Sequence, residues 1–179
     1  MSKILQKAIW GIEQLSLAGG ALAGIMLAGI ALLMLTEIFM RSFAGTSLSF
    51  SWEYSAYFMA TVFFLGAAYT LRAGGHVRVT LLHEWLPESV GRILEFTATM
   101  LGLIIAGYAA LAVSKLALIS MERGTTSFTP TRTPLFVPQS LVALGLILLT
   151  AQFVARLFRW VLRAPLDPGG AKLDAARDQ

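Results

Sequence analysis

Four stretches of the 179-residue sequence contain no Asp, Glu, Lys or Arg, and they constrain the fold more than any other feature. They are 23, 18, 19 and 23 residues long and cover residues 14–36, 54–71, 96–114 and 133–155. The hydrocarbon core of a bilayer is about 30 Å thick, which about 20 helical residues cross. The sequence therefore predicts an all-α membrane protein with four transmembrane helices, over about 14–37, 53–72, 95–117 and 133–156.

The segments between these stretches are too short for a soluble catalytic or receptor domain. Charged residues make up 13% of the chain, about half of what a soluble domain carries. We expect one four-helix membrane domain over residues 1–163 and a mobile cytoplasmic tail over 164–179. The sequence has no cysteine, which excludes disulfide scaffolds and cysteine metal sites.

The first residues form an amphipathic stretch, because apolar side chains recur at helical spacing over residues 2–14, with Lys3 and Lys7 mostly on the other side. One interpretation is a short helix that lies flat in the membrane interface, and the other is an early start of the first span. The apolar run that follows continues to Thr36 and is too long for the core of a cleaved signal peptide. We therefore expect this helix to be retained.

The basic residues predict the orientation, since Lys and Arg in short loops stay on the cytoplasmic side. Four lie in the two loops that follow the first and third spans: Arg41, Lys115, Arg123 and Arg132. The other ten lie near the termini or in the loop between the second and third spans. Both termini are therefore expected in the cytoplasm.

Small residues recur every four positions in two of the spans, which lets helix backbones approach closely. These candidate packing residues are Gly20, Gly24 and Ala28 in the first span, and Gly102, Ala106 and Ala110 in the third. The pattern does not tell whether the facing helix belongs to this chain or to another protein.

Two groups of polar and aromatic residues are candidate contacts at the ends of the spans. Arg72, His76, Arg78 and Trp85 lie in the loop after the second span and could bind lipid headgroups or a partner, or serve only as orientation signals. Glu37, Arg41, Trp52 and Glu53 flank the first outer loop and could contact a partner or close the hairpin within the chain.

The chemistry of transport and catalysis is missing from the spans. An ion or proton pathway places ionisable side chains at depth, yet none lies near the middle of any span. His76 and His83 are the two histidines, and both lie in a loop, so haem ligation between spans and a compact metal site are excluded. No nucleophile elbow or phosphate-binding loop occurs. We therefore predict no catalytic, cofactor-binding or metal-binding residue.

Two motifs suggest a family. Residues 64–82 read FLGAAYTLRAGGHVRVTLL, followed by Leu86-Pro87, and residues 133–139 read TPLFVPQ. Together with Trp52 and Glu53, they resemble the small membrane subunit of tripartite ATP-independent periplasmic (TRAP) transporters, the DctQ-like family. The sequence departs from the family pattern at Thr80, where Asp is frequent, and at Phe136, where Trp is frequent.

The resemblance implies a non-catalytic scaffold in the bacterial inner membrane. Such subunits pair with a large DctM-like membrane subunit that holds the substrate and sodium sites, while a periplasmic binding protein delivers an organic acid. Partners would then be these two proteins and membrane lipids, with no nucleic acid and no cofactor in this chain. The alternative left open is a stand-alone transporter or channel that self-associates through its small-residue stripes.

Overall fold

The computed structural model describes residues 3–73 and 88–162. These residues form the helices α1 (Lys3–Phe39), α2 (Ser51–Ala73), α4 (Glu88–Glu122) and α5 (Phe136–Val161), with a short π-helical turn, η1 (Met40–Ala44), after α1. Four of these helices are long and apolar enough to cross a membrane. Within the described ranges the extended structure amounts to an isolated bridge between Thr126 and Pro134. The prediction of an all-α fold with four membrane-crossing helices is confirmed.

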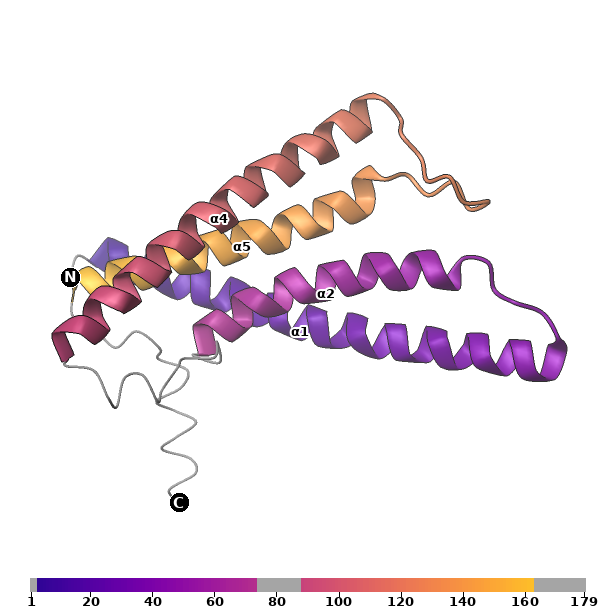
Figure 1. The fold of residues 1–179 in the computed structure, drawn as a ribbon, viewed down its shortest axis with the longest axis horizontal. Coiled ribbons are helices and arrows are strands. Elements are labelled where there is room, and N and C mark those ends of the chain that lie inside the picture. Colours follow the sequence, from indigo (N-terminus) through magenta and orange to yellow (C-terminus); the bar gives the residue numbers. More distant parts are fainter. Residues whose placement is uncertain (1–2, 74–87, 163–179) are drawn as a thin grey trace, which may run out of the picture.

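The helices form two antiparallel hairpins, α1 with α2 and α4 with α5, which join mainly through α2 and α5. Figure 1 shows that the hairpins converge where the chain begins and diverge toward the loops that connect their helices. We call the end with the start of α1 and the end of α5 the termini end, and the opposite end the loop end. The fold therefore holds its helices more tightly at the termini end.

Local sequence signals set where these helices turn. The turn η1 ends at Gly45, whose φ of 65° is left-handed and whose backbone N–H donates to the Met40 carbonyl. At the start of α5, Pro138 occupies the first turn, where its missing N–H costs no helical hydrogen bond. Both hairpin loops therefore begin or end at residues suited to breaking a helix.

Helix α1 runs without a break from Lys3 and is 37 residues long, about 55 Å at 1.5 Å per residue. The amphipathic stretch at the N-terminus is therefore part of the first long helix, which favours the early-start interpretation over a separate interfacial helix. Ile9 is buried in the bundle, whereas Trp10 on the next position is exposed. The helix exceeds the thickness of the hydrocarbon core, so its first turns extend beyond the core or the helix tilts.

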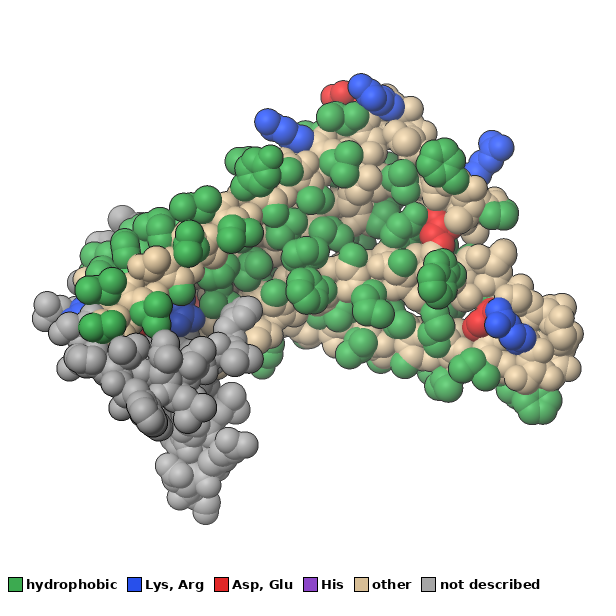
Figure 2. Space-filling view, viewed as in Figure 1, with side chains coloured by type: hydrophobic (Ala, Val, Ile, Leu, Met, Phe, Trp, Pro, Cys, Tyr) green, Lys and Arg blue, Asp and Glu red, His purple; other side chains and the backbone are tan. Residues whose placement is uncertain are grey.

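Buried positions on two helices repeat every seven residues. They are Ile9, Ser16, Ala23, Ile30 and Glu37 on α1, and Pro138, Gly145, Gln152 and Arg159 on α5. A seven-residue period keeps one narrow seam facing its neighbour in a left-handed supercoil. The remaining surface of the helices is largely apolar (Figure 2), as a lipid environment allows.

The two hairpins meet at a backbone contact between α5 and α2. A Cβ added to Gly145 would lie 2.8 Å from Phe64 Cβ and 2.9 Å from the Leu65 backbone nitrogen. Real Cβ atoms essentially never come so near another heavy atom. Glycine at position 145 therefore sets how closely the two hairpins pack.

The predicted stripe on the first span is divided between two environments. A Cβ on Gly20 would lie 2.7 Å from the Tyr69 ring in α2, so this glycine faces the hairpin partner. Gly24 has open space around it, and both Gly24 and Ala28 are exposed. The first part of the stripe therefore packs inside the chain, and the rest faces outward.

The predicted stripe on the third span lies within the α4–α5 hairpin. A Cβ on Gly102 would lie 2.5 Å from the Phe153 ring of α5. Ala106 and Ala110 are buried further along α4, whose main neighbour is α5. This stripe faces another helix of the same chain.

Candidate functional site: polar contacts at the two ends of the bundle

A buried amide joins α5 to α1 inside the apolar part of the bundle. The Gln152 side chain donates from Nε2 to Ser16 Oγ (2.7 Å) and to the Ile12 carbonyl (3.2 Å). Gln152 and Ser16 are almost fully buried, and hydrogen bonds between membrane helices contribute about 0.6 kcal/mol each. This contact is structural, because both partners belong to the chain.

Two ion pairs connect α5 to its neighbours at the termini end. Arg159 pairs with Glu13 of α1, and Arg156 Nη2 lies 2.9 Å from Glu95 Oε1 of α4. All four side chains are largely buried. Each charge faces an opposite charge of this chain, so the two pairs link three helices at this end.

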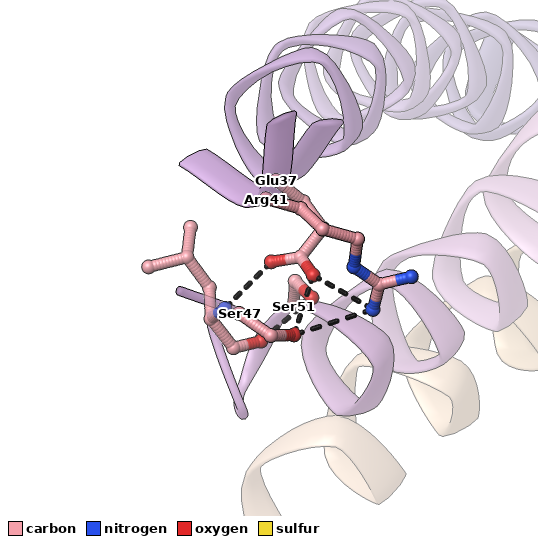
Figure 3. Close-up of polar contacts among 5 residues, drawn as sticks. Glu37, Arg41, Ser47 and Ser51 are labelled. Atoms are coloured by element: carbon pink, nitrogen blue, oxygen red, sulfur yellow. Dashed lines mark hydrogen bonds and ion pairs between the residues drawn. The ribbon is translucent and has the colours of Figure 1, made fainter. Parts of the chain in front are cut away.

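At the loop end, a cluster around Glu37 closes the α1–α2 hairpin (Figure 3). Glu37 Oε1 accepts from Ser47 Oγ (2.6 Å) and Arg41 Nη2 (3.2 Å), and Glu37 Oε2 accepts from the Leu48 backbone N–H (2.7 Å). Ser51 at the start of α2 donates to the Leu48 carbonyl (2.8 Å). One carboxylate therefore holds the loop between the two helices in place.

A second carboxylate at the loop end, Glu53, connects α2 to the other hairpin. Tyr57 donates its hydroxyl to Glu53 Oε1 (2.9 Å). Thr129 and Thr131, which belong to the loop between α4 and α5, both donate to Glu53 Oε2. Glu53 is buried, and all of these donors are neutral hydroxyls. This contact bridges the two hairpins where they diverge.

The loop that reaches Glu53 is itself ordered by backbone hydrogen bonds, and we call residues 125–135 the strap. The backbone N–H of Leu135 donates to the Thr125 carbonyl (3.0 Å), and that of Ser127 donates to the Thr133 carbonyl (2.9 Å). Arg132 lies at the turn with φ of 45°, a left-handed conformation that an L side chain seldom adopts. The strap is therefore a defined structural element.

The predicted outer group does not form one cluster. Glu37 and Arg41 belong to the first hairpin's loop, and Glu53 belongs to the strap contact. Trp52 takes part in neither, since 82% of its surface is exposed.

Of the second predicted group, Arg72 lies at the termini end of α2, and its Nε is buried with no hydrogen-bond partner among residues 3–73 and 88–162. His76, Arg78 and Trp85 lie outside the described residues.

Sequence reasoning missed the residues that join the helices. Ser16 and Gln152 are polar side chains inside apolar windows, and such residues often form hydrogen bonds between membrane helices. The strap is rich in Ser and Thr, but no sequence signal connects it to Glu53, which lies 76 and 78 residues away from its two strap donors.

Two shallow grooves, of about 670 and 570 Å³, lie on the helix surface toward the loop end. One is lined in part by Phe50, Tyr54 and Phe58, the other in part by Trp52 and Met59, and neither has a charged residue in its wall. Residues 3–73 and 88–162 also bring together no group of three side chains that could hold a metal ion. An organic anion would find no cationic partner in these grooves.

Comparison with known protein families decides what kind of protein this is. Residues 30–163 match the family described as tripartite ATP-independent periplasmic transporters, DctQ component. The chain belongs to the DctQ family. Comparisons with curated proteins and with solved structures gave no match.

Membership of the DctQ family makes the chain a component of a TRAP transporter and a multi-pass membrane protein. The match confirms the resemblance seen in the sequence motifs. Glu37, Glu53 and the strap lie within the matched residues, whereas Glu13 and Ser16 precede them. The DctQ region therefore contains both loop-end contacts and the α5 side of the two polar contacts between α5 and α1.

Proposed function

We propose that this chain is the non-catalytic scaffold subunit of its TRAP transporter, in which it braces the large membrane subunit. The transporter would be a sodium-coupled secondary transporter that takes up an organic acid delivered by a periplasmic binding protein. The substrate and sodium sites would lie in the large subunit, and this chain would need no cofactor.

The proposal rests on how the chain uses its buried charged residues. In the part of the chain that the structure describes, the most deeply buried charged residues are Glu37, Glu53 and Arg159. Each of them bonds to another group of this chain, and each lies near the end of a helix. An ion or proton pathway places ionisable side chains at depth in the membrane. These three groups instead stabilise the fold.

The proposed orientation places the termini end on the cytoplasmic face of the bacterial inner membrane. Ten of the 14 basic residues then lie on the cytoplasmic side, in agreement with the positive-inside rule. The Glu37 cluster and the strap would face the periplasm, where the binding protein acts.

The proposal is tested by expressing the large membrane subunit with and without this chain. We expect the two to purify together, and the large subunit alone to unfold at lower temperature and to lose uptake. Addition of the purified chain should restore uptake without changing the substrate concentration at half-maximal rate.

Two results would count against a bracing role. One is a large subunit that is equally stable and active without this chain. The other is an assembled complex in which neutralising Glu37 or Glu53 changes the sodium dependence of uptake, since the proposal places no coupling-ion ligand in this chain.

A further inference from the structure

The strap presents one aromatic ring to the solvent. Phe128 lies between Ser127 and Thr129, whose hydroxyls belong to the network around Glu53. The residue is fully exposed, so its ring contacts almost nothing in the described part of the chain. Large aromatic side chains are frequent anchors at protein–protein interfaces, where they fill a pocket of the partner.

The surroundings of Phe128 are polar and positively charged. Its exposed neighbours in the strap include Thr126, Pro130 and Arg132. More widely, the loop end exposes the cations Arg41, Lys115, Arg123 and Arg132, as the blue side chains on that side of Figure 2 show. Among the acidic residues there, Glu37 and Glu53 are turned inward and Glu122 is exposed. The exposed surface of this end is therefore cationic.

We propose that Phe128 and Arg132 form a docking point for an acidic surface of a soluble protein, with the Phe128 ring inserted into an apolar pocket. This inference rests on the proposed function and its orientation, in which the soluble partner at the loop end is the periplasmic binding protein of the transporter. Charge complementarity brings the partner to the strap, and the aromatic anchor slows its release.

The position of the strap favours a soluble partner over the bilayer. The strap bonds to Glu53 in the first turn of α2, before the apolar stretch of that helix begins. A segment that inserts into the membrane interface exposes several apolar side chains on one face. The strap exposes one aromatic ring among Thr, Pro and Arg, which resembles an anchor within a polar rim.

The test uses the assembled small and large subunits in proteoliposomes, with the binding protein added outside. Phe128→Ala should raise the binding-protein concentration at half-maximal uptake about tenfold, the change that 1.4 kcal/mol of binding energy produces, with the maximal rate unchanged. Arg132→Glu should raise it as well, with a larger effect at low salt. The matched control is Phe43→Ala, because Phe43 lies in η1 at the same end of the bundle and is 78% exposed, and it should have no effect.

An unchanged half-maximal concentration in Phe128→Ala would overturn the inference, as would an equal shift in Phe43→Ala. A second measurement tests insertion into lipid. The chain has no cysteine, so Phe128→Cys carries a single fluorescent label. We expect a water-soluble quencher to reach the label and the binding protein to shield it. Quenching from within the bilayer, with no shielding, would identify a membrane-inserted loop and refute docking.

The inference and the proposed function fail in different ways. If the wild-type chain neither assembles with the large subunit nor supports uptake, the proposed function is wrong. If the complexes assemble and transport, but the Phe128 variants respond to the binding protein as the wild type does, the docking point alone is wrong.

Discussion

Replacing Gly145 with alanine should push α2 and α5 slightly apart where the two hairpins meet and lower the stability of the chain. The new Cβ would lie 2.8 Å from Phe64 Cβ and 2.9 Å from the Leu65 backbone nitrogen. Ordinary contact begins at 3.4 Å, so α2 and α5 must move apart by about 0.6 Å. Backbone atoms cannot rotate away as a side chain can, and the whole helix contact takes up the displacement.

The magnitude follows from the lost contacts. A gap of 0.5–1 Å removes about a quarter to a half of the dispersion energy between facing atoms, and overpacking a tight interface costs about 1–3 kcal/mol. Against this, alanine favours the helix by up to about 1 kcal/mol. We expect Gly145→Ala to lower the free energy of unfolding by about 1–2 kcal/mol.

Unfolding in mixed detergent micelles, followed by circular dichroism as the denaturing detergent increases, measures this change. Gly107→Ala is the matched control, because its Cβ would lie 3.8 Å from Thr150 Cγ2, an ordinary contact. Gly24→Ala, with open space around it, is a second control. If Gly145→Ala is as stable as these two variants, the close contact between α2 and α5 does not hold the hairpins together.

Three further predictions concern the polar contacts. Gln152→Leu removes the hydrogen bonds to Ser16 Oγ and to the Ile12 carbonyl and should lower the free energy of unfolding by about 1 kcal/mol, measured in the same detergent titration. An unchanged free energy of unfolding would show that this contact does not stabilise the bundle. Glu13→Gln removes the carboxylate that Arg159 meets on α1 and should lower the free energy of unfolding, by less than the about 3–5 kcal/mol of a fully buried pair, since the guanidinium can extend toward headgroups. An unchanged free energy of unfolding would show that the pair does not stabilise the bundle. Glu53→Gln should speed hydrogen exchange of the strap amides several-fold without altering the other loop, and unchanged exchange would mean that the strap does not depend on this carboxylate.

The sequence was sufficient to predict the four membrane-crossing helices, because a charged side chain is too costly in hydrocarbon to occur by accident. It was also sufficient for the family, through motifs around residues 64–82 and 133–139. Which helix faces contact each other was harder to predict. In a bilayer the outward surface is as apolar as the buried seam, so hydrophobic periodicity carries little information there.

The four-residue spacing of small residues led to Gly24 and Ala28, which face outward, as well as to Gly20, which packs on Tyr69. The seam that α1 buries repeats every seven residues instead and includes Ser16 and Glu37. A search for that period, with polar residues allowed on the seam, would have found it. The Glu53 contact with the strap could not be found in this way, because it depends on how the two hairpins pack in three dimensions.

In the proposed role, this chain supports transport and supplies none of its chemistry. Uptake of labelled substrate into sodium-free proteoliposomes that contain the purified chain alone, with and without sodium in the external buffer, tests this role. We expect no uptake above protein-free vesicles until the large subunit and the binding protein are both added. Sodium-driven uptake by this chain alone would overturn the bracing role and would support a self-associating transporter instead.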